Sequence, residues 1–154
     1  MKSGGKFWPL HIMEDDIALN KAAIIRRCLK RVQEDFQSDP GRLDNFTTQD
    51  AIVLNLLRAC EAAIDLAMHR VAVRRLGIPQ HSRDAFDLLL QSQNLTSGTA
   101  QAMKNMIGFR NIAVHSYQQL QRPILEAILL RHLPDFERYL SEISVDKTVF
   151  HPPQ

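Results

Sequence analysis

The sequence of 154 residues lacks long hydrophobic runs. No stretch of about 18 apolar residues occurs, which excludes a membrane-spanning helix, and the first residues lack the apolar segment of a secretory signal. Cysteine is scarce as well. Cys28 and Cys60 both fall within apolar helical patterns, so we expect buried free thiols and not a disulfide scaffold. These absences predict a cytoplasmic protein that does not bind membranes.

An excess of charge of one sign is also missing. The chain carries 19 basic and 17 acidic residues, a net charge of +2, within an ordinary globular composition of 45% hydrophobic residues. Basic residues nevertheless gather in two clusters, which comprise Arg26, Arg27, Lys30 and Arg31, and Arg70, Arg74 and Arg75. Each cluster is either a solvated helix face or a patch that guides a polyanion such as RNA.

No segment alternates like a β-strand, whereas apolar residues recur at helical spacing along most of the chain. The pattern predicts an all-α bundle of four main helices plus a short one. The expected helices cover 14–36, 47–76, 83–91, a segment from Thr96 or Ser97, and a last segment from Pro123 that Pro134 interrupts. We assign residues 1–13 to a flexible N-terminal extension, 14–145 to a single helical domain and 146–154 to a frayed tail.

The long second helix carries a polar line of Arg58, Glu61, Asp65 and His69 beside its apolar line. This line is either a solvent-exposed stripe with local ion pairs or the lining of a cleft or subunit contact.

Most motifs of enzyme chemistry are absent. The sequence has no phosphate-cradling glycine-rich loop, no GxSxG elbow, no CxxC pair and no HExxH helix. Its six histidines never approach one another at the spacing of metal ligands. We therefore expect no metal site and no resident cofactor.

One segment concentrates reactive side chains. Within residues 108–117, Arg110, Asn111, His115 and Tyr117 are the polar groups able to do chemistry. If this segment is a continuous helix, Arg110 and Tyr117 share a face two turns apart, and Asn111 and His115 share a neighbouring face. Arginine grips phosphate and histidine transfers protons near neutral pH, while RNA supplies its own 2′-hydroxyl nucleophile. The alternative is a buried polar cluster that fixes helix packing.

The pattern Arg110-Asn111-xxx-His115-x-Tyr117 resembles the Arg-x4-His motif of the HEPN superfamily, extended by the x-Tyr of HepT-type toxins. The segments 48–69, 76–89 and 103–120 are similar to the same branch, and the resemblance covers residues 15–145. It implies a helical-bundle homodimer that acts as a metal-independent endoribonuclease, with paired Arg/His motifs at the cleft between subunits. It also implies that Arg110 and His115 are catalytic and that Asn111 supports them.

The resemblance further implies a toxin–antitoxin pair in which an MntA-type minimal nucleotidyltransferase adenylylates Tyr117. ATP and Mg²⁺ then belong to that partner, and the substrate is tRNA or mRNA. Two other hypotheses stay open: a non-catalytic HEPN dimer that serves as a scaffold for the nucleotidyltransferase, and a substrate-binding subunit that presents a small molecule to it. The presence of both Arg110 and His115 favours the ribonuclease, because a scaffold does not need them.

Overall fold

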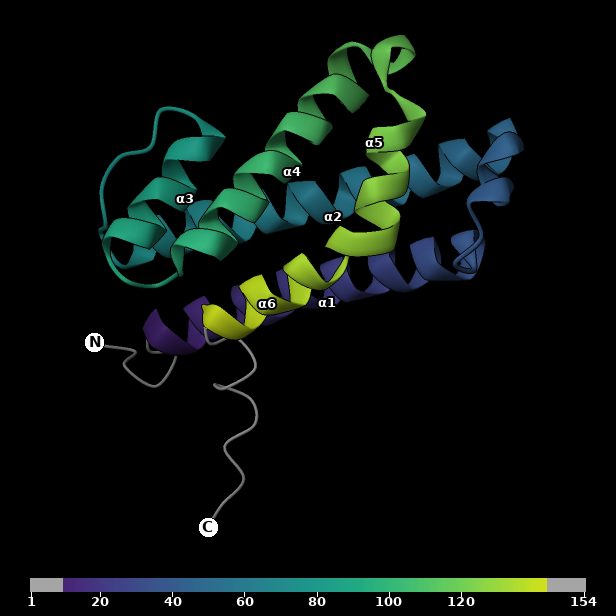
Figure 1. Cartoon of the computed structure of the whole chain (residues 1–154). Helices are drawn as coiled ribbons and strands as arrows, with labels where there is room; N and C mark the ends of the chain where they lie inside the picture. Colours follow the sequence, from purple (N-terminus) through teal and green to yellow (C-terminus); the bar gives the residue numbers. More distant parts are fainter. Residues whose placement is uncertain (1–9, 144–154) are drawn as a thin grey trace.

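The computed structural model describes residues 10–143, with side chains from Asp16 onward. Its first two helices, α1 (Leu10–Phe36) and α2 (Phe46–Val73), form a long antiparallel pair (Figure 1). Helix α1 begins at Leu10, earlier than the expected start near residue 14. The other residues of the expected N-terminal extension, and the expected tail, lie outside the described residues.

Short polar side chains build the connection between α1 and α2. A 3-10 helix, η2 (Pro40–Asp44), begins where the Gly41 amide donates to Asp39 Oδ1 at 2.9 Å. The next cap belongs to Asn45, whose Oδ1 accepts from the Thr48 amide at 3.0 Å. Short polar side chains thus satisfy the first free amides of both elements.

Two further helices cover this pair. Helix α3 (Ser82–Gln91) packs on α2 and on α4 (Ser97–His115). His81 is the N-cap of α3, where Ser82 was expected, and its amide donates to Asp84 Oδ2 at 3.0 Å. Thr96 caps α4 as predicted. The sequence signals therefore located these helices to within one residue at their starts.

The last predicted helix is divided as the proline requires. Helix α5 (Arg122–Ala127) continues into a π-helical turn, η4 (Ile128–His132), and α6 (Pro134–Glu142) then begins at the proline. Proline lacks an amide hydrogen and its ring crowds the carbonyl four residues earlier, which a wider π turn accommodates. Within the described residues there is no β-strand, so the all-α prediction is confirmed.

The core is a single cluster to which all six α-helices contribute. Tyr139 of α6 is fully buried, meets Phe86 of α3 edge-on at 5.6 Å between ring centres, and donates its hydroxyl to the Ala63 carbonyl at 2.8 Å. Burial raises the pKa of this phenol far above its usual range. Among the described helices, none is both long and apolar enough to cross a membrane.

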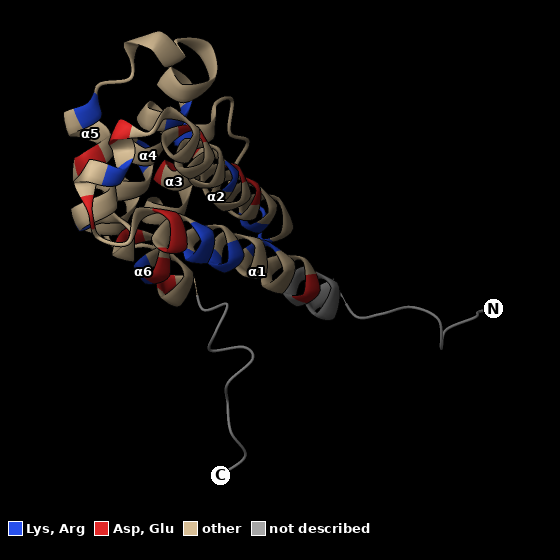
Figure 2. Cartoon of the chain, turned by 90° about the vertical axis from the view of Figure 1, so that its right-hand side faces the viewer, with Lys and Arg blue, Asp and Glu red and all other residues tan. Residues whose placement is uncertain are grey.

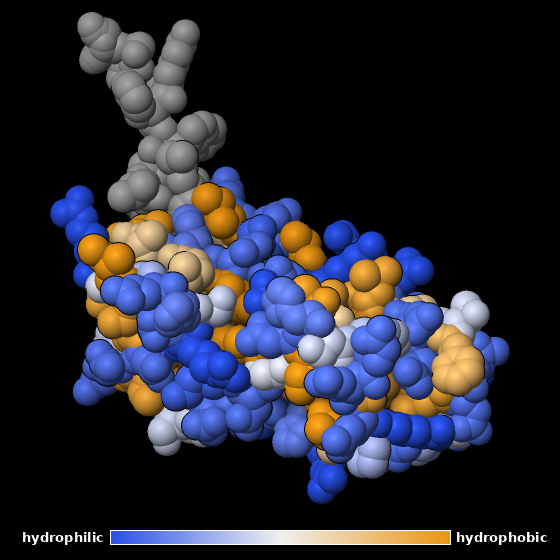
Figure 3. All heavy atoms as spheres, turned by 90° about the horizontal axis from the view of Figure 1, so that it is seen from above, coloured by the Kyte–Doolittle hydropathy of each residue, from blue (hydrophilic) through white to orange (hydrophobic). Residues whose placement is uncertain are grey.

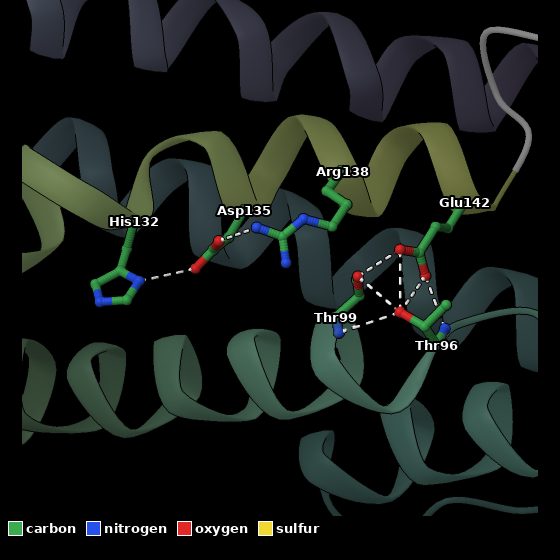
Figure 4. Close-up of polar contacts among 6 residues, drawn as sticks. All are labelled: Thr96, Thr99, His132, Asp135, Arg138 and Glu142. Atoms are coloured by element: carbon green, nitrogen blue, oxygen red, sulfur yellow. Dashed lines mark hydrogen bonds and ion pairs between the residues drawn. The ribbon is translucent and has the colours of Figure 1, made fainter.

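A carboxylate on α6 holds the first turn of α4 in place. Glu142 accepts from the Thr96 amide at 2.7 Å and from the Thr99 hydroxyl at 2.5 Å (Figure 4). Burial opposes ionisation of Glu142, but the hydrogen bonds from these two threonines outweigh it and lower the pKa of its carboxyl. The ionised carboxylate therefore stabilises the fold.

We predict that Glu142→Gln lowers the free energy of unfolding at pH 7, and that the difference from the parent protein shrinks as the pH falls below about 4. A carboxyl whose pKa is lowered on folding stabilises above its unfolded pKa and loses that contribution as the pH falls through its folded pKa. Urea unfolding of both proteins at pH 7 and at a pH below about 4 measures this difference in the free energy of unfolding. Glu34→Gln, at an exposed position on α1, is the control. An equal loss at both pH values would contradict the assignment.

Candidate active site

Arg110 lies at the seam between α2 and α4, where it is partly buried. Its Nε donates to Glu61 Oε1 of α2 at 2.5 Å, and its Nη1 donates to Asn111 Oδ1 at 3.0 Å. Two acceptors therefore fix the plane of the guanidinium while its remaining N–H groups stay free for another acceptor. Glu61 belongs to the polar line that the sequence placed on α2, and its contact with Arg110 favours the cleft interpretation of that line.

His115 is the last residue of α4, and its side chain is exposed. Asn111 lies one turn earlier on the same helix, as the spacing predicted. The helix ends here because Ser116 leaves the helical conformation, with φ −150° and ψ 51°. The site thus combines an oriented guanidinium with a solvent-accessible imidazole about 7.5 Å farther along one helix axis.

Tyr117 does not continue α4, so the expectation that it shares a helical face with Arg110 is wrong. It begins a 3-10 turn, η3 (Tyr117–Gln119), which returns the chain toward the start of α2. There its hydroxyl donates to Asp50 Oδ1 at 2.5 Å and accepts from the Gln49 amide at 3.5 Å. Partial burial, followed by the hydrogen bond to Asp50, raises the pKa of the phenol.

The phenol and the guanidinium therefore contact α2 at different places. Asp50 and Glu61 are separated by three turns of α2, about 16 Å along its axis. Residue spacing could not predict this separation. The helical pattern continues through the four residues before Ser116, and no glycine or proline marks the end of α4. Asp50 and Gln49 are the site residues that sequence reasoning missed.

The thiol of Cys60, beside the site, is unreactive. Cys60 is buried beside Glu61, and its Sγ–H faces the Met106 carbonyl at 3.9 Å. Burial, and then the neighbouring Glu61, raise the pKa of this thiol to about 12. Cys60 is therefore protonated at neutral pH and is no nucleophile. Both cysteines are free and buried, as predicted.

Metal ligands do not gather in the described part of the chain. Among its residues, no group of three or more His, Cys, Asp or Glu side chains is arranged to hold a metal ion. The chemistry that the site offers comes from its side chains: donors for an anionic oxygen at Arg110 and a proton-transfer group at His115.

The two predicted basic clusters are not uniform patches. Lys and Arg residues follow α1 where it passes α6 (Figure 2), and there Arg26 donates to both carboxylate oxygens of Glu137 at 2.8 and 3.2 Å. Arg70 is only 3% exposed, so the expectation that it projects to solvent is wrong. Arg74 donates to Asn94 Oδ1 at 3.1 Å. The exposed members of the clusters are Arg27, Lys30, Arg31, Arg74 and Arg75.

The family model described as ribonuclease HepT-like matches residues 18–143. The mRNA nuclease HepT of Shewanella oneidensis is 44% identical over 132 residues, which cover 86% of this chain and 99% of that protein.

Solved structures agree with these matches. The tri-AMPylated Shewanella oneidensis HEPN toxin, in complex with MNT antitoxin, is 45% identical and superposes with a TM-score of 0.80 over 84% of this chain and 97% of its own. A toxin–antitoxin structure with AMP-PNP has a TM-score of 0.79 at 44% identity and covers 83% and 98%. The Bacillus subtilis protein YutE, 16% identical with a TM-score of 0.64 over 84% and 93%, shares the fold.

Proposed function

Because the chain belongs to the ribonuclease HepT-like family, we propose that it is the toxin of a toxin–antitoxin pair and an endoribonuclease that cleaves mRNA in the cytoplasm. The observation that carries this proposal is the pairing of Arg110, held in one plane by Glu61 and Asn111, with the exposed His115 at the end of the same helix. In this pair Arg110 binds the anionic phosphate and His115 accepts a proton. Cleavage of RNA by its own 2′-hydroxyl requires both functions.

In the proposed reaction the 2′-oxygen attacks the adjacent phosphorus. His115 takes the proton of the 2′-hydroxyl, the new O2′–P bond forms, and the P–O5′ bond breaks to leave a 2′,3′-cyclic phosphate. The departing O5′ receives a proton from the motif of a second copy of the chain. Arg110 offsets the charge that builds on the phosphate oxygens, and it can do so without rearrangement because Glu61 and Asn111 already hold it. The proposed reaction uses no metal ion.

Arg110→Ala and His115→Ala should each lower the rate of RNA cleavage by about 10²-fold or more, since general acid–base catalysis contributes about 10²–10⁴-fold. Cleavage of labelled mRNA in EDTA, with the cyclic-phosphate end identified by mass spectrometry, measures this. Both residues lie at the surface of the bundle, so circular dichroism should show an unchanged fold. Loss of wild-type cleavage in EDTA, or full activity of both variants, would contradict the mechanism.

A second copy of the chain is expected across the seam between α2 and α4. One motif on one bundle leaves His115 exposed to solvent, whereas two motifs related by a twofold axis would enclose a cleft. Two apolar side chains flank the motif and remain uncovered: Leu54 of α2 is 45% exposed and Val114 of α4 is 48% exposed. We propose that they pack at the edge of the dimer contact.

The homodimer has a direct test. Light scattering should give twice the mass of the chain, and Leu54→Glu with Val114→Glu should shift the protein toward the monomer and reduce cleavage, because a charge at an apolar contact must be desolvated without a partner. Leu130→Glu, which changes a 53% exposed leucine on the π-helical turn, is the control. A monomeric wild-type mass at micromolar concentration would contradict the shared cleft.

Control by an antitoxin is proposed to act through Tyr117. A minimal nucleotidyltransferase would transfer AMP from ATP to the phenol: the phenol loses its proton, its oxygen bonds to the α-phosphorus, and pyrophosphate leaves. Asp50 and Gln49 already hold this hydroxyl at the surface. A single AMP on this oxygen does not reach Arg110, given the separation along α2. It blocks RNA by placing a bulky anion beside His115, two residues before the modified tyrosine. Three AMP groups, the number on the tri-AMPylated relative, would cover more of the seam than one.

Tyr117→Phe should cleave RNA like the parent protein, since the phenol takes no part in the proposed reaction, and it should escape inactivation by the antitoxin with ATP. Intact-mass analysis after incubation with both should show AMP adducts on the parent protein and none on the variant. An antitoxin variant unable to bind ATP is the control. Equal inhibition by the active and the inactive antitoxin would show that binding alone neutralises the toxin.

A further inference from the structure

A second concave site lies on the side of α4 that faces away from Arg110. It is a groove of about 940 Å³ between α4, α5, the π-helical turn and α6. Helix α4 lines it with residues spaced alternately three and four apart, namely Gly98, Gln101, Asn105, Gly108 and Ile112. This spacing is one continuous face of a helix, and Arg110 projects from the opposite side.

The groove is strongly biased toward positive charge. Arg83 of α3 and Arg131 of the π-helical turn line it and have no ion-pair partner among the described residues. His132 and Arg138 also line it, and both are held by Asp135, at 3.0 and 2.8 Å (Figure 4). Asp135 is only 6% exposed and is the one carboxylate of the lining. A buried acid thus positions a guanidinium and an imidazole at the wall.

A glycine gives one of these cations access to the groove. A Cβ atom at position 108 would lie 3.3 Å from Nη2 of Arg83, so the absence of a side chain lets the guanidinium lie against α4. At the other end of the helix, a Cβ at Gly98 would meet nothing within 4 Å. The wall of α4 is therefore open at Gly98 and closely approached by a cation at Gly108.

The groove leads toward the candidate active site. Ile112 lines its end, and His115 follows one turn later on the same helix. Leu120, just past the η3 turn that carries Tyr117, lines the same end. A chain whose phosphate sits at His115 can therefore continue past Ile112 into the groove without crossing the core.

We propose that this groove binds single-stranded RNA next to the scissile phosphate, a proposal that rests on the ribonuclease function proposed above. Arg83, Arg131 and Arg138 would contact phosphates, and the amides of Gln101 and Asn105 would contact base edges. On the face seen in Figure 3, hydrophobic residues are interleaved with hydrophilic ones and do not form one broad patch. The lining of the groove itself combines apolar side chains, Ile112 and Ile124 among them, with the cations named above, so it offers surface to bases as well as to phosphates.

The charge reversal Arg131→Glu tests the groove, with Arg75→Glu as its matched control. Arg75 is exposed just after α2, has no ion-pair partner among the described residues and lies outside the groove. For an RNA of some twenty nucleotides, we expect Arg131→Glu to raise KM about fivefold or more, the loss of one charge-assisted phosphate contact. Cleavage of a dinucleotide, which does not reach the groove, should stay unchanged in both variants. Equal effects of the two reversals would indicate general electrostatics and overturn the proposal.

A substitution that changes no charge tests the shape of the groove separately from its electrostatics. Gly98→Trp places a bulky side chain at the wall of the groove, where a Cβ atom meets nothing within 4 Å, and it should also raise KM for the long RNA. Binding of a fluorescent RNA to His115→Ala protein, with and without each groove substitution, tests the groove independently of catalysis. If the parent protein cleaves no RNA yet His115→Ala loses RNA affinity on Arg131→Glu, the ribonuclease function fails and the binding groove stands. Unchanged RNA affinity in both groove variants would overturn the groove.

Discussion

Helix α4 is held at both of its ends, and this double attachment is the constraint on which both surfaces of interest depend. At its start, the Glu142 carboxylate of α6 accepts hydrogen bonds from the Thr96 cap and from Thr99. Near its end, Arg110 is bound to Glu61 of α2. Between these points α4 buries Met103 and Met106 in the core and cannot rotate without breaking one of the two attachments. Its orientation therefore fixes which side chains face the seam and which face the groove.

The helices were predictable because local chemistry marks most of their ends. Asp39, Asn45 and Thr96 are polar caps that the chain carries where amides need acceptors, and Pro134 begins α6 as its missing amide hydrogen requires. The end of α4 has no such mark. Ser116 breaks the helix with neither glycine nor proline nearby, and the phenol of Tyr117 is then drawn to Asp50, a contact between residues far apart in the sequence. Helical periodicity predicts that Tyr117 lies on α4, because periodicity takes no account of contacts between residues far apart in the sequence.

Charge was the property that the sequence located least well. Clusters of arginine along one helix are visible in a sequence, but their surroundings are not: Arg26 is occupied by Glu137, and Arg70 turns into the core. The basic lining of the groove is the opposite case. Arg83, Arg131 and Arg138 come from three separate helical elements and are brought together only by the fold, with the buried Asp135 as the organising acid. That Arg110 and His115 lie close along the chain's fourth helix was predictable, because one continuous helical pattern contains both.

The end of α4 at Ser116 also determines how much of the structure an inactivating modification must affect. Tyr117, the residue proposed for adenylylation, lies on a short turn outside α4, and its hydroxyl contacts only the first turns of α2. Under that proposal the modification would alter no helix, so an inactivated molecule would stay folded and removal of the AMP group would restore activity without refolding.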